Sequence, residues 1–408
     1  MINRIIPRQI TNPVQHRNFK YVLQDGLAVG YTTSAMPFLA VFLTRLGASN
    51  FQVGLLTSMP AIAGLFFAIP LGSWLQRKRN LIPWYSWTRV IQLSGFALTG
   101  LIPFILPRSD WIPAIILVWG LITLPQAILT ILFNVVMSSV AGSIGRFELL
   151  SRRWALVGLI TTATTLAIGV ILTRREFPFN FQLVFLLVSI GAIFSFIYTS
   201  RLSIPENIPI NSEDVGLIGR FKQIFTSVKG YPSFLSFTFK RFIFLTGVAF
   251  AAPLFPIYYV RQADLSDISI AYITMGQTLI MVLGYFIWLK ISRSGGSRPI
   301  LLWTTLGLSL FPILVALTTK SGLIILIASI AGFFQAGLDL VFFDELMRNI
   351  PTDQSPTFVA FAQTTQYLTT MISPLVSAWL AMTLGLSYAL IFAGLIQFSG
   401  FLLFTRKT

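Results

Sequence analysis

The chain has 408 residues, of which 55% are hydrophobic and only 10% are charged, and its formal net charge is +16. Soluble domains carry about 25% charged residues, so this composition excludes a soluble globular fold and predicts a protein with many membrane spans. The sequence has no Cys and a single His, His16, which excludes a disulfide framework, thiol chemistry and a metal centre built from Cys or His.

Six apolar runs follow a polar, basic segment at residues 1–20. The runs are 21–43, 51–75, 82–106, 111–140, 150–172 and 181–199. Each is about 20 residues or longer and shows no alternation of polar and apolar residues. They therefore predict helices that cross a hydrocarbon layer of about 30 Å, and not the strands of a barrel.

A polar stretch at residues 201–230 separates these runs from six more. The later runs are 231–260, 269–290, 299–319, 323–347, 357–383 and 387–405. The first part of the polar stretch, 201–211, contains two prolines and is predicted to be extended. The second part, 214–229, is amphipathic, with Leu217 and Phe221 on one face. This favours a helix lying on the inner leaflet, and a solvated linker helix is the alternative.

The two sets of runs predict an all-α membrane protein with twelve transmembrane helices in two pseudo-symmetric six-helix bundles, residues 21–200 and 231–405. Weak internal similarity supports this duplication, because the order Leu132-Phe133-Asn134 recurs in similar form as Phe342-Phe343-Asp344. Small residues recur at helical spacing along the second run, at Gly54, Ser58, Ala61, Gly64, Ala68 and Gly72. They predict a face for close packing at the seam between the halves, with the end of this helix touching the start of the eleventh.

Basic residues set the predicted orientation. They are concentrated in the N-terminal segment, in the run Arg77-Lys78-Arg79 after the second span, and in alternate loops beyond it. Because Lys and Arg mark the cytoplasmic ends of spans, both termini are predicted to be cytoplasmic, in the plasma (inner) membrane. Topology thus accounts for the positive charge, and nucleic acid is not an expected partner.

Twelve spans in two halves, joined by a long cytoplasmic linker, resemble the major facilitator superfamily of secondary transporters. That family has a loop motif after its second helix: Gly, three residues, Asp, Arg, one residue and Gly. Here Gly72 and Arg77 match, whereas Gln76 replaces the acid and Arg79 replaces the second Gly. The fourth span has no Arg and the fifth has no Gly-Pro pair, so two further motifs of the family are absent. The resemblance implies that the first, fourth, seventh and tenth helices line a central cavity.

Ionisable side chains inside spans are costly and usually functional. Arg89, in the third span, is expected to snorkel or to brace its helix. The other intramembrane charges lie on the four helices that the resemblance places around the cavity. The candidates for substrate or proton binding are Asp25, Gln126, Asn134, Lys240, Arg241, Gln277, Gln335 and Asp339. Asp25 is the leading proton carrier, because burial favours the neutral form of a carboxyl group.

Three interpretations of these charges stay open. Lys240 or Arg241 pairs with Asp339 or Asp344, either to neutralise charge or to form a gate; the charges bind substrate or protons; or they snorkel to the interface. The candidate gate or loop residues are Gly72, Gln76, Arg77 and Asp344.

No arrangement of residues typical of an enzyme is found, and no cofactor is expected. The sequence therefore predicts a secondary active transporter of a small organic solute that works by alternating access and is coupled to protons, with export slightly favoured over uptake. Its expected partners are the solute, protons and membrane lipids, and it is expected to be a monomer. The alternative is a non-transporting membrane assembly factor or receptor built on the same scaffold.

Overall fold

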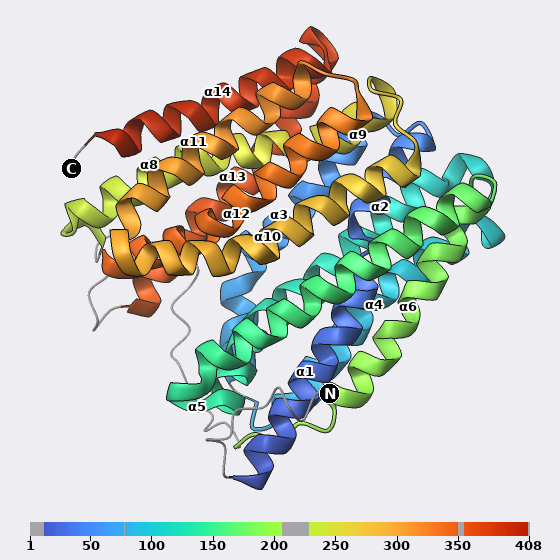
Figure 1. The fold of residues 1–408 in the computed structure, drawn as a ribbon. Coiled ribbons are helices and arrows are strands. Elements are labelled where there is room, and N and C mark those ends of the chain that lie inside the picture. Colours follow the sequence, from blue (N-terminus) through green and yellow to red (C-terminus); the bar gives the residue numbers. More distant parts are fainter. Residues whose placement is uncertain (1–11, 77, 206–227, 350–354, 407–408) are drawn as a thin grey trace. The chain divides into compact units, whose positions relative to one another are not determined.

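The computed structural model describes residues 12–76, 78–205, 228–349 and 355–406, and every described element is a helix (Figure 1). The helices of the N-terminal half are α1 (Pro13–Thr33), α2 (Met36–Arg45), α3 (Asn50–Gln76), α4 (Ile82–Ile105), the short η2 (Arg108–Asp110), α5 (Trp111–Arg174) and α6 (Phe179–Thr199). Those of the C-terminal half are α8 (Pro232–Ala251), α9 (Leu254–Arg261), α10 (Asp267–Gly295), α11 (Ser297–Ala316), α12 (Ser321–Arg348), α13 (Ser355–Leu384) and α14 (Leu386–Thr405).

Twelve stretches of the described residues are long and apolar enough to span a membrane, which confirms the predicted twelve-span, all-α fold. Two spans are interrupted helices, since the first comprises α1 and α2 and the seventh comprises α8 and α9. The single long helix α5 carries both the fourth and the fifth span. The predicted interfacial helix at 214–229 falls almost entirely outside the described residues.

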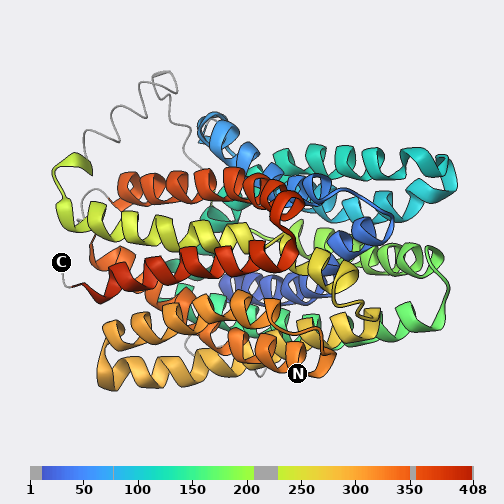
Figure 2. The same ribbon diagram turned by 90° about the horizontal axis from the view of Figure 1, so that it is seen from above.

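Helix packing divides the chain into two compact units (Figures 1 and 2). Unit 1 holds the described residues of Met1–Phe38 and Phe66–Glu213, and unit 2 holds those of Leu39–Leu65 and Asp214–Thr408. In unit 1, α1 and α4 each pack against α5 and α6. In unit 2, α10 packs on α12, α14 lies between α8 and α11, and α13 packs on α8. The segment 39–65, which comes early in the chain, therefore belongs to the unit of the late helices.

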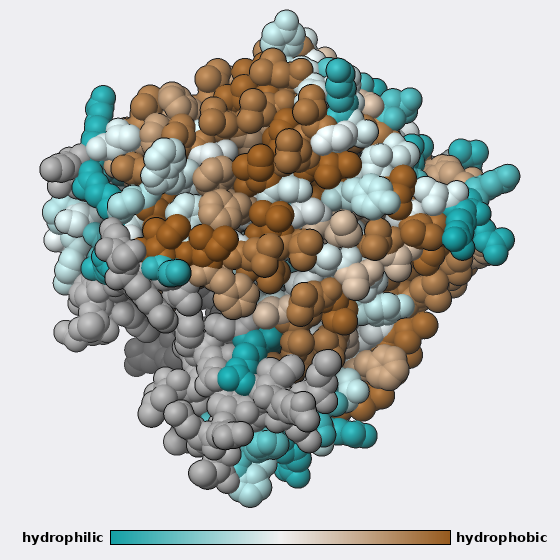
Figure 3. Space-filling model, viewed as in Figure 1, coloured by the Kyte–Doolittle hydropathy of each residue, from teal (hydrophilic) through white to brown (hydrophobic). Residues whose placement is uncertain are grey.

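Each unit has its own apolar core. In unit 1 the core includes Phe19 and Tyr85, and in unit 2 it is rich in Phe rings such as Phe234, Phe244 and Phe342. Many large apolar side chains point outward instead, and brown side chains cover the middle of the face drawn in Figure 3, while teal ones lie nearer its edges. An apolar outer surface is what a protein surrounded by hydrocarbon requires, because lipid tails give no penalty for exposed apolar groups.

Small residues allow close helix contact at the predicted face of the second span. A methyl group placed on Gly54 would lie 3.0 Å from the carbonyl oxygen of Pro374, and one placed on Gly64 would lie 2.7 Å from the ring of Tyr367. Both contacts are with α13 and lie within unit 2. The side chains of Ala68 and Gly72 lie outside the described residues, as does the predicted contact with the start of the eleventh span, since residues 350–354 are not described.

Candidate functional site

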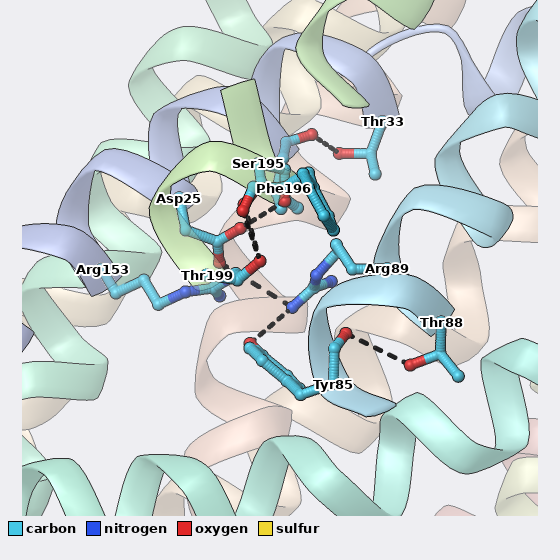
Figure 4. Close-up of polar contacts among 10 residues, drawn as sticks. Asp25, Thr33, Tyr85, Thr88, Arg89, Arg153, Ser195, Phe196 and Thr199 are labelled. Atoms are coloured by element: carbon cyan, nitrogen blue, oxygen red, sulfur yellow. Dashed lines mark hydrogen bonds and ion pairs between the residues drawn. The ribbon is translucent and has the colours of Figure 1, made fainter. Parts of the chain in front are cut away.

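A buried carboxylate stands at the centre of a polar cluster in unit 1 (Figure 4). Asp25 on α1 is 1% exposed, and its Oδ2 accepts a hydrogen bond from Nη2 of Arg153 on α5 at 3.1 Å. Nη2 of Arg89 on α4 lies 3.8 Å from the same oxygen. On the other side of the carboxylate, Ser195 on α6 donates to Oδ1 at 2.5 Å. One acidic side chain thus ties together all four main helices of unit 1.

Two guanidinium groups face this single carboxylate, so the cluster holds an excess of positive charge. Arg153 is 1% exposed and Arg89 is 6% exposed. Arg89 also donates to the phenol oxygen of Tyr85 at 2.9 Å, and Arg153 lies over the ring of Phe133 at 5.0 Å. Asp25 therefore contacts two guanidinium groups and one hydroxyl donor among packed helices, which gives it a structural role in unit 1.

This arrangement changes one expectation from the sequence. Arg153, at the start of the fifth run, counts among the basic residues that were expected to be cytoplasmic, but it is buried and forms the closest ion pair to Asp25. Arg89 was expected to snorkel or to brace its helix, and it lies inside unit 1 beside Asp25. Asp25 itself does not snorkel. Ser195 gave no signal, because its partner lies 170 residues away and a Ser in a span is common.

A second carboxylate, in unit 2, has very different surroundings. Asp339 on α12 is exposed, and it accepts hydrogen bonds from the phenol of Tyr285 at 2.8 Å and from the amide of Gln335 at 2.8 Å. No Lys or Arg among the described residues forms an ion pair with it. Asp339 lies seven residues before Leu346, the last residue of its span, so it is about 10 Å inside along the helix. A carboxylate at that depth requires contact with water, since facing lipid would be strongly unfavourable.

An arginine in the same unit also has only neutral partners. Arg241 on α8 is 9% exposed, donates from Nη2 to the amide oxygen of Gln366 at 2.6 Å, and approaches the carbonyl of Ala362 at 3.4 Å. Its guanidinium carbon lies 5.8 Å from the ring centre of Phe342. Its Nε is buried without a hydrogen-bond partner among the described residues. Gln366 was not among the predicted site or gate residues. Its polar side chain within an apolar run was the feature of the sequence that could have indicated it.

The expected pairing of Lys240 or Arg241 with Asp339 or Asp344 is therefore wrong for this structure. Lys240 reaches the carbonyl of Arg406 at 3.3 Å, at the end of α14. Asp344 pairs with Arg348 one turn later on α12, at 3.0 Å and at an exposed position. Lys240 thus reaches toward a helix end, as a snorkelling side chain does. The interpretation of the other charges as binding residues stays a prediction.

The remaining predicted residues contribute less. Gln126 and Gln277 are half-buried on α5 and α10. The backbone of Gln277 packs closely against Gly332 on α12. Gly72 and Gln76 are helical residues of α3, but their side chains lie outside the described residues. The side chain of Asn134 is also outside them, and so is the whole of Arg77.

A reciprocal pair of arginines joins two loops of unit 2. Arg45, the last residue of α2, donates to the Asp267 carboxylate at 2.7 Å and to the carbonyl of Leu265 at 2.8 Å. Arg261, the last residue of α9, donates to the side chain of Asn50 at 2.6 Å and to the carbonyl of Ala48. We call these contacts the arginine clasp.

The clasp repeats one pattern twice. In each case an arginine ends the second helix of an interrupted span. It binds one carbonyl and the first residue of the long helix that follows the other arginine, so Arg45 binds Asp267 of α10 and Arg261 binds Asn50 of α3. These residues were not predicted as a site from the sequence. Their matching places, just after the first and the seventh apolar run, could have indicated a shared role for Arg45 and Arg261.

Known proteins resemble this chain in fold but not in sequence. No family model matches the sequence, and no curated protein sequence matches it. Solved structures match its fold. The nucleoside transporter NupG superposes with a TM-score of 0.74 at 10% identity, over 95% of this chain and 99% of that chain.

Two further solved structures give the same result. A POT family transporter in complex with a thioalcohol-conjugated peptide has a TM-score of 0.71 at 13% identity, covering 98% of each chain. The human organic anion transporter MFSD10 (TETRAN) has a TM-score of 0.64 at 14% identity, over 96% of this chain and 100% of that chain. The protein is an integral multi-pass membrane protein. Its fold is that of the twelve-helix major facilitator transporters, as the resemblance implied.

Proposed function

We propose that the protein is a secondary active transporter of a small organic solute, that it works by alternating access, and that a proton bound at Asp339 drives it. The fold is one that serves transport in the solved proteins it matches. The observation that carries the proton assignment is the environment of Asp339, an exposed carboxylate deep in a span with neutral partners only.

Asp25 and Asp339, the two carboxylates within spans, differ in a property that a proton carrier needs. A carrier must exist in both the charged and the neutral form. Asp25 forms an ion pair with Arg153 inside packed helices, and loss of that pair would strand the charge of Arg153. Asp339 has two neutral donors and access to solvent, so neither form leaves a partner charge unpaired. We therefore assign proton carriage to Asp339 in place of Asp25.

The arginine clasp is the proposed gate at the outer end of the pathway. It ties the end of α2 to the start of α10 and the end of α9 to the start of α3, through hydrogen bonds that exchange easily with water once the loops separate. Export is the expected direction, and the expected setting is the plasma (inner) membrane, with cytoplasmic termini and a monomeric chain among lipids. Flux into inside-out vesicles tests the direction.

Proton-driven flux tests the proposal directly. The purified full-length chain is reconstituted into liposomes containing a pH-sensitive dye, and an imposed pH gradient is combined with a panel of small organic solutes. We expect at least one solute to accumulate with the gradient and to carry protons. Asp339→Asn should abolish accumulation while solute exchange at equal pH on both sides persists. Asp110→Asn, which removes an exposed carboxylate from the short η2 turn, is the matched control and should behave as the native chain.

Two results would refute the proposal. If no solute of a broad panel moves in either direction, the chain is a non-transporting scaffold. If Asp339→Asn accumulates solute as well as the native chain does, the proton is carried elsewhere.

A further inference from the structure

The buried guanidinium of Arg241 is an unbalanced charge within the membrane-spanning part of unit 2. It lies nine residues after Pro232, where its span begins, which corresponds to about 14 Å along the helix. None of the described residues offers it a carboxylate, and its hydrogen bonds go to one amide and one carbonyl. Positive charge held by neutral dipoles alone is costly in a span, and such sites usually have an anion as their missing partner.

Among the described residues, Arg241 has one unused donor and one hydrogen bond that is only partly buried. Nε is buried and makes no hydrogen bond with the described residues, and the bond from Nη2 to Gln366 is only partly buried. A carboxylate accepts two parallel N–H bonds from a guanidinium edge, such as the one formed by Nε and Nη2. Binding in this way fills the unused donor and displaces the side chain of Gln366, which is flexible.

Asp339 lies on the helix that contacts this group, and its hydrogen-bond partners among the described residues are neutral. Phe342 is in contact with the Arg241 guanidinium and follows Asp339 by three residues on α12, so the two side chains are neighbours on one helix face. Other titratable or charged groups on the surrounding helices include Tyr285, Tyr272, Asp267 and Lys290 on α10, Lys240 on α8, Arg298 on α11, Asp344, Glu345 and Arg348 on α12, Tyr367 on α13, and Arg406 after α14. Of these, only Tyr285 bonds to Asp339, while Lys240, Asp344 and Glu345 bond elsewhere.

We propose that Arg241 binds the carboxylate group of an anionic organic solute, and that this anion and a proton on Asp339 bind together. The inference rests on the proposed transport function and names its substrate class. With Asp339 ionised, the region carries one positive and one negative charge and gives an anion little attraction. When Asp339 takes a proton, the charge of Arg241 is left unbalanced and attracts the anion. By linkage, bound anion favours the proton to the same degree.

Ligand binding to the purified full-length chain tests the substrate class. The probes are three acids and their amides, acetate with acetamide, succinate with succinamide, and benzoate with benzamide, with benzylamine as the cation. Binding is measured by thermal shift at constant ionic strength, at mildly acidic and at alkaline pH. We expect at least one carboxylate to bind more tightly than its amide, and more tightly at the lower pH. Arg241→Gln should weaken this binding by about tenfold or more, because a charge-assisted bond is lost.

Two more variants separate a binding role from a structural one. Arg241→Lys keeps the charge without the planar pair of donors, so it should retain part of the carboxylate affinity and its pH dependence. Arg298→Gln removes the charge of an exposed arginine of unit 2, which donates to the carbonyl of Thr405 at 3.5 Å, and should leave carboxylate affinity unchanged. Asp339→Asn should bind carboxylate at both pH values with no preference for the lower one.

The outcomes distinguish this inference from the proposed function. The inference is overturned if no carboxylate binds, if amides or benzylamine bind as tightly, or if Arg241→Gln keeps the native affinity. Proton-coupled flux of a neutral or cationic solute that survives Arg241→Gln would also overturn it, while leaving the transport proposal intact. If no solute is transported but carboxylate binding depends on Arg241, the anion site is supported and the transport proposal is refuted.

Discussion

Nη2 of Arg153 lies 3.1 Å from Oδ2 of Asp25, although the two residues are 128 positions apart in the chain. The pair connects α1 to α5 in the interior of unit 1, where both side chains are about 1% exposed. A buried ion pair contributes little net stability compared with an apolar pair, but removal of one partner leaves the other charge stranded. Asp25 and Arg153 are therefore expected to matter for folding before they matter for transport.

Arg153→Met should destabilise the protein by about 3–5 kcal/mol, because the Asp25 carboxylate keeps only the more distant Arg89. Addition of Asp25→Asn should recover part of this loss by removing the stranded charge. Thermal unfolding of the purified protein in detergent measures both effects. The control is Arg348→Met, which breaks the exposed pair with Asp344 and should cost no more than about 1 kcal/mol. Equal losses at the buried and the exposed pair would contradict this account.

Close backbone contact between α1 and α5 gives a second stability prediction. A methyl group on Gly30 would lie 2.7 Å from the carbonyl oxygen of Val157 and 3.1 Å from its Cα, so the two helices would have to separate. Gly30→Ala should destabilise unit 1 by about 1–3 kcal/mol, as overpacking does. Gly322→Ala, on α12, meets nothing within 4 Å and should be neutral or slightly stabilising in the same unfolding assay. A neutral Gly30→Ala would show that the helices are not held this closely.

The fold was accessible from the sequence because twelve long apolar runs and the basic residues between them are local signals. The site was accessible only in part. Asp25, Arg241 and Asp339 stood out as charges in apolar runs, but their partners depend on which helices pack together, and no local pattern encodes that. Arg153 illustrates the limit, because it follows Arg152 at a span boundary and so looks like half of a solvated basic pair.

Tyr285→Phe should shift the pH dependence of transport. The phenol of Tyr285 is one of two donors to the Asp339 carboxylate, and such donors stabilise the ionised form. Without it, the carboxylate keeps only the Gln335 donor, so proton-driven flux should persist to higher pH than in the native chain. Initial rates measured over a range of pH in liposomes test this. Tyr272→Phe, an exposed residue on the same helix, is the control. A curve that stays in place, or moves to lower pH, would contradict proton carriage at Asp339.

Removal of both clasp arginines should open the loops of unit 2. Arg45→Gln together with Arg261→Gln deletes the donors to Asp267, Leu265, Asn50 and Ala48, so the end of α2 is released from the start of α10 and the end of α9 from the start of α3. The chain contains no Cys, so spin labels on Ser49→Cys and Ser266→Cys, both exposed, report without background. We expect the distance distribution between the labels to gain a longer component in the double variant. Arg108→Gln, in the exposed η2 turn, should leave the distribution unchanged.

Because the two arginines perform matching tasks, each single variant should populate the longer distance less than the double variant does. An unaltered distribution in the double variant would mean that the loops are held by packing and that the clasp is not the gate.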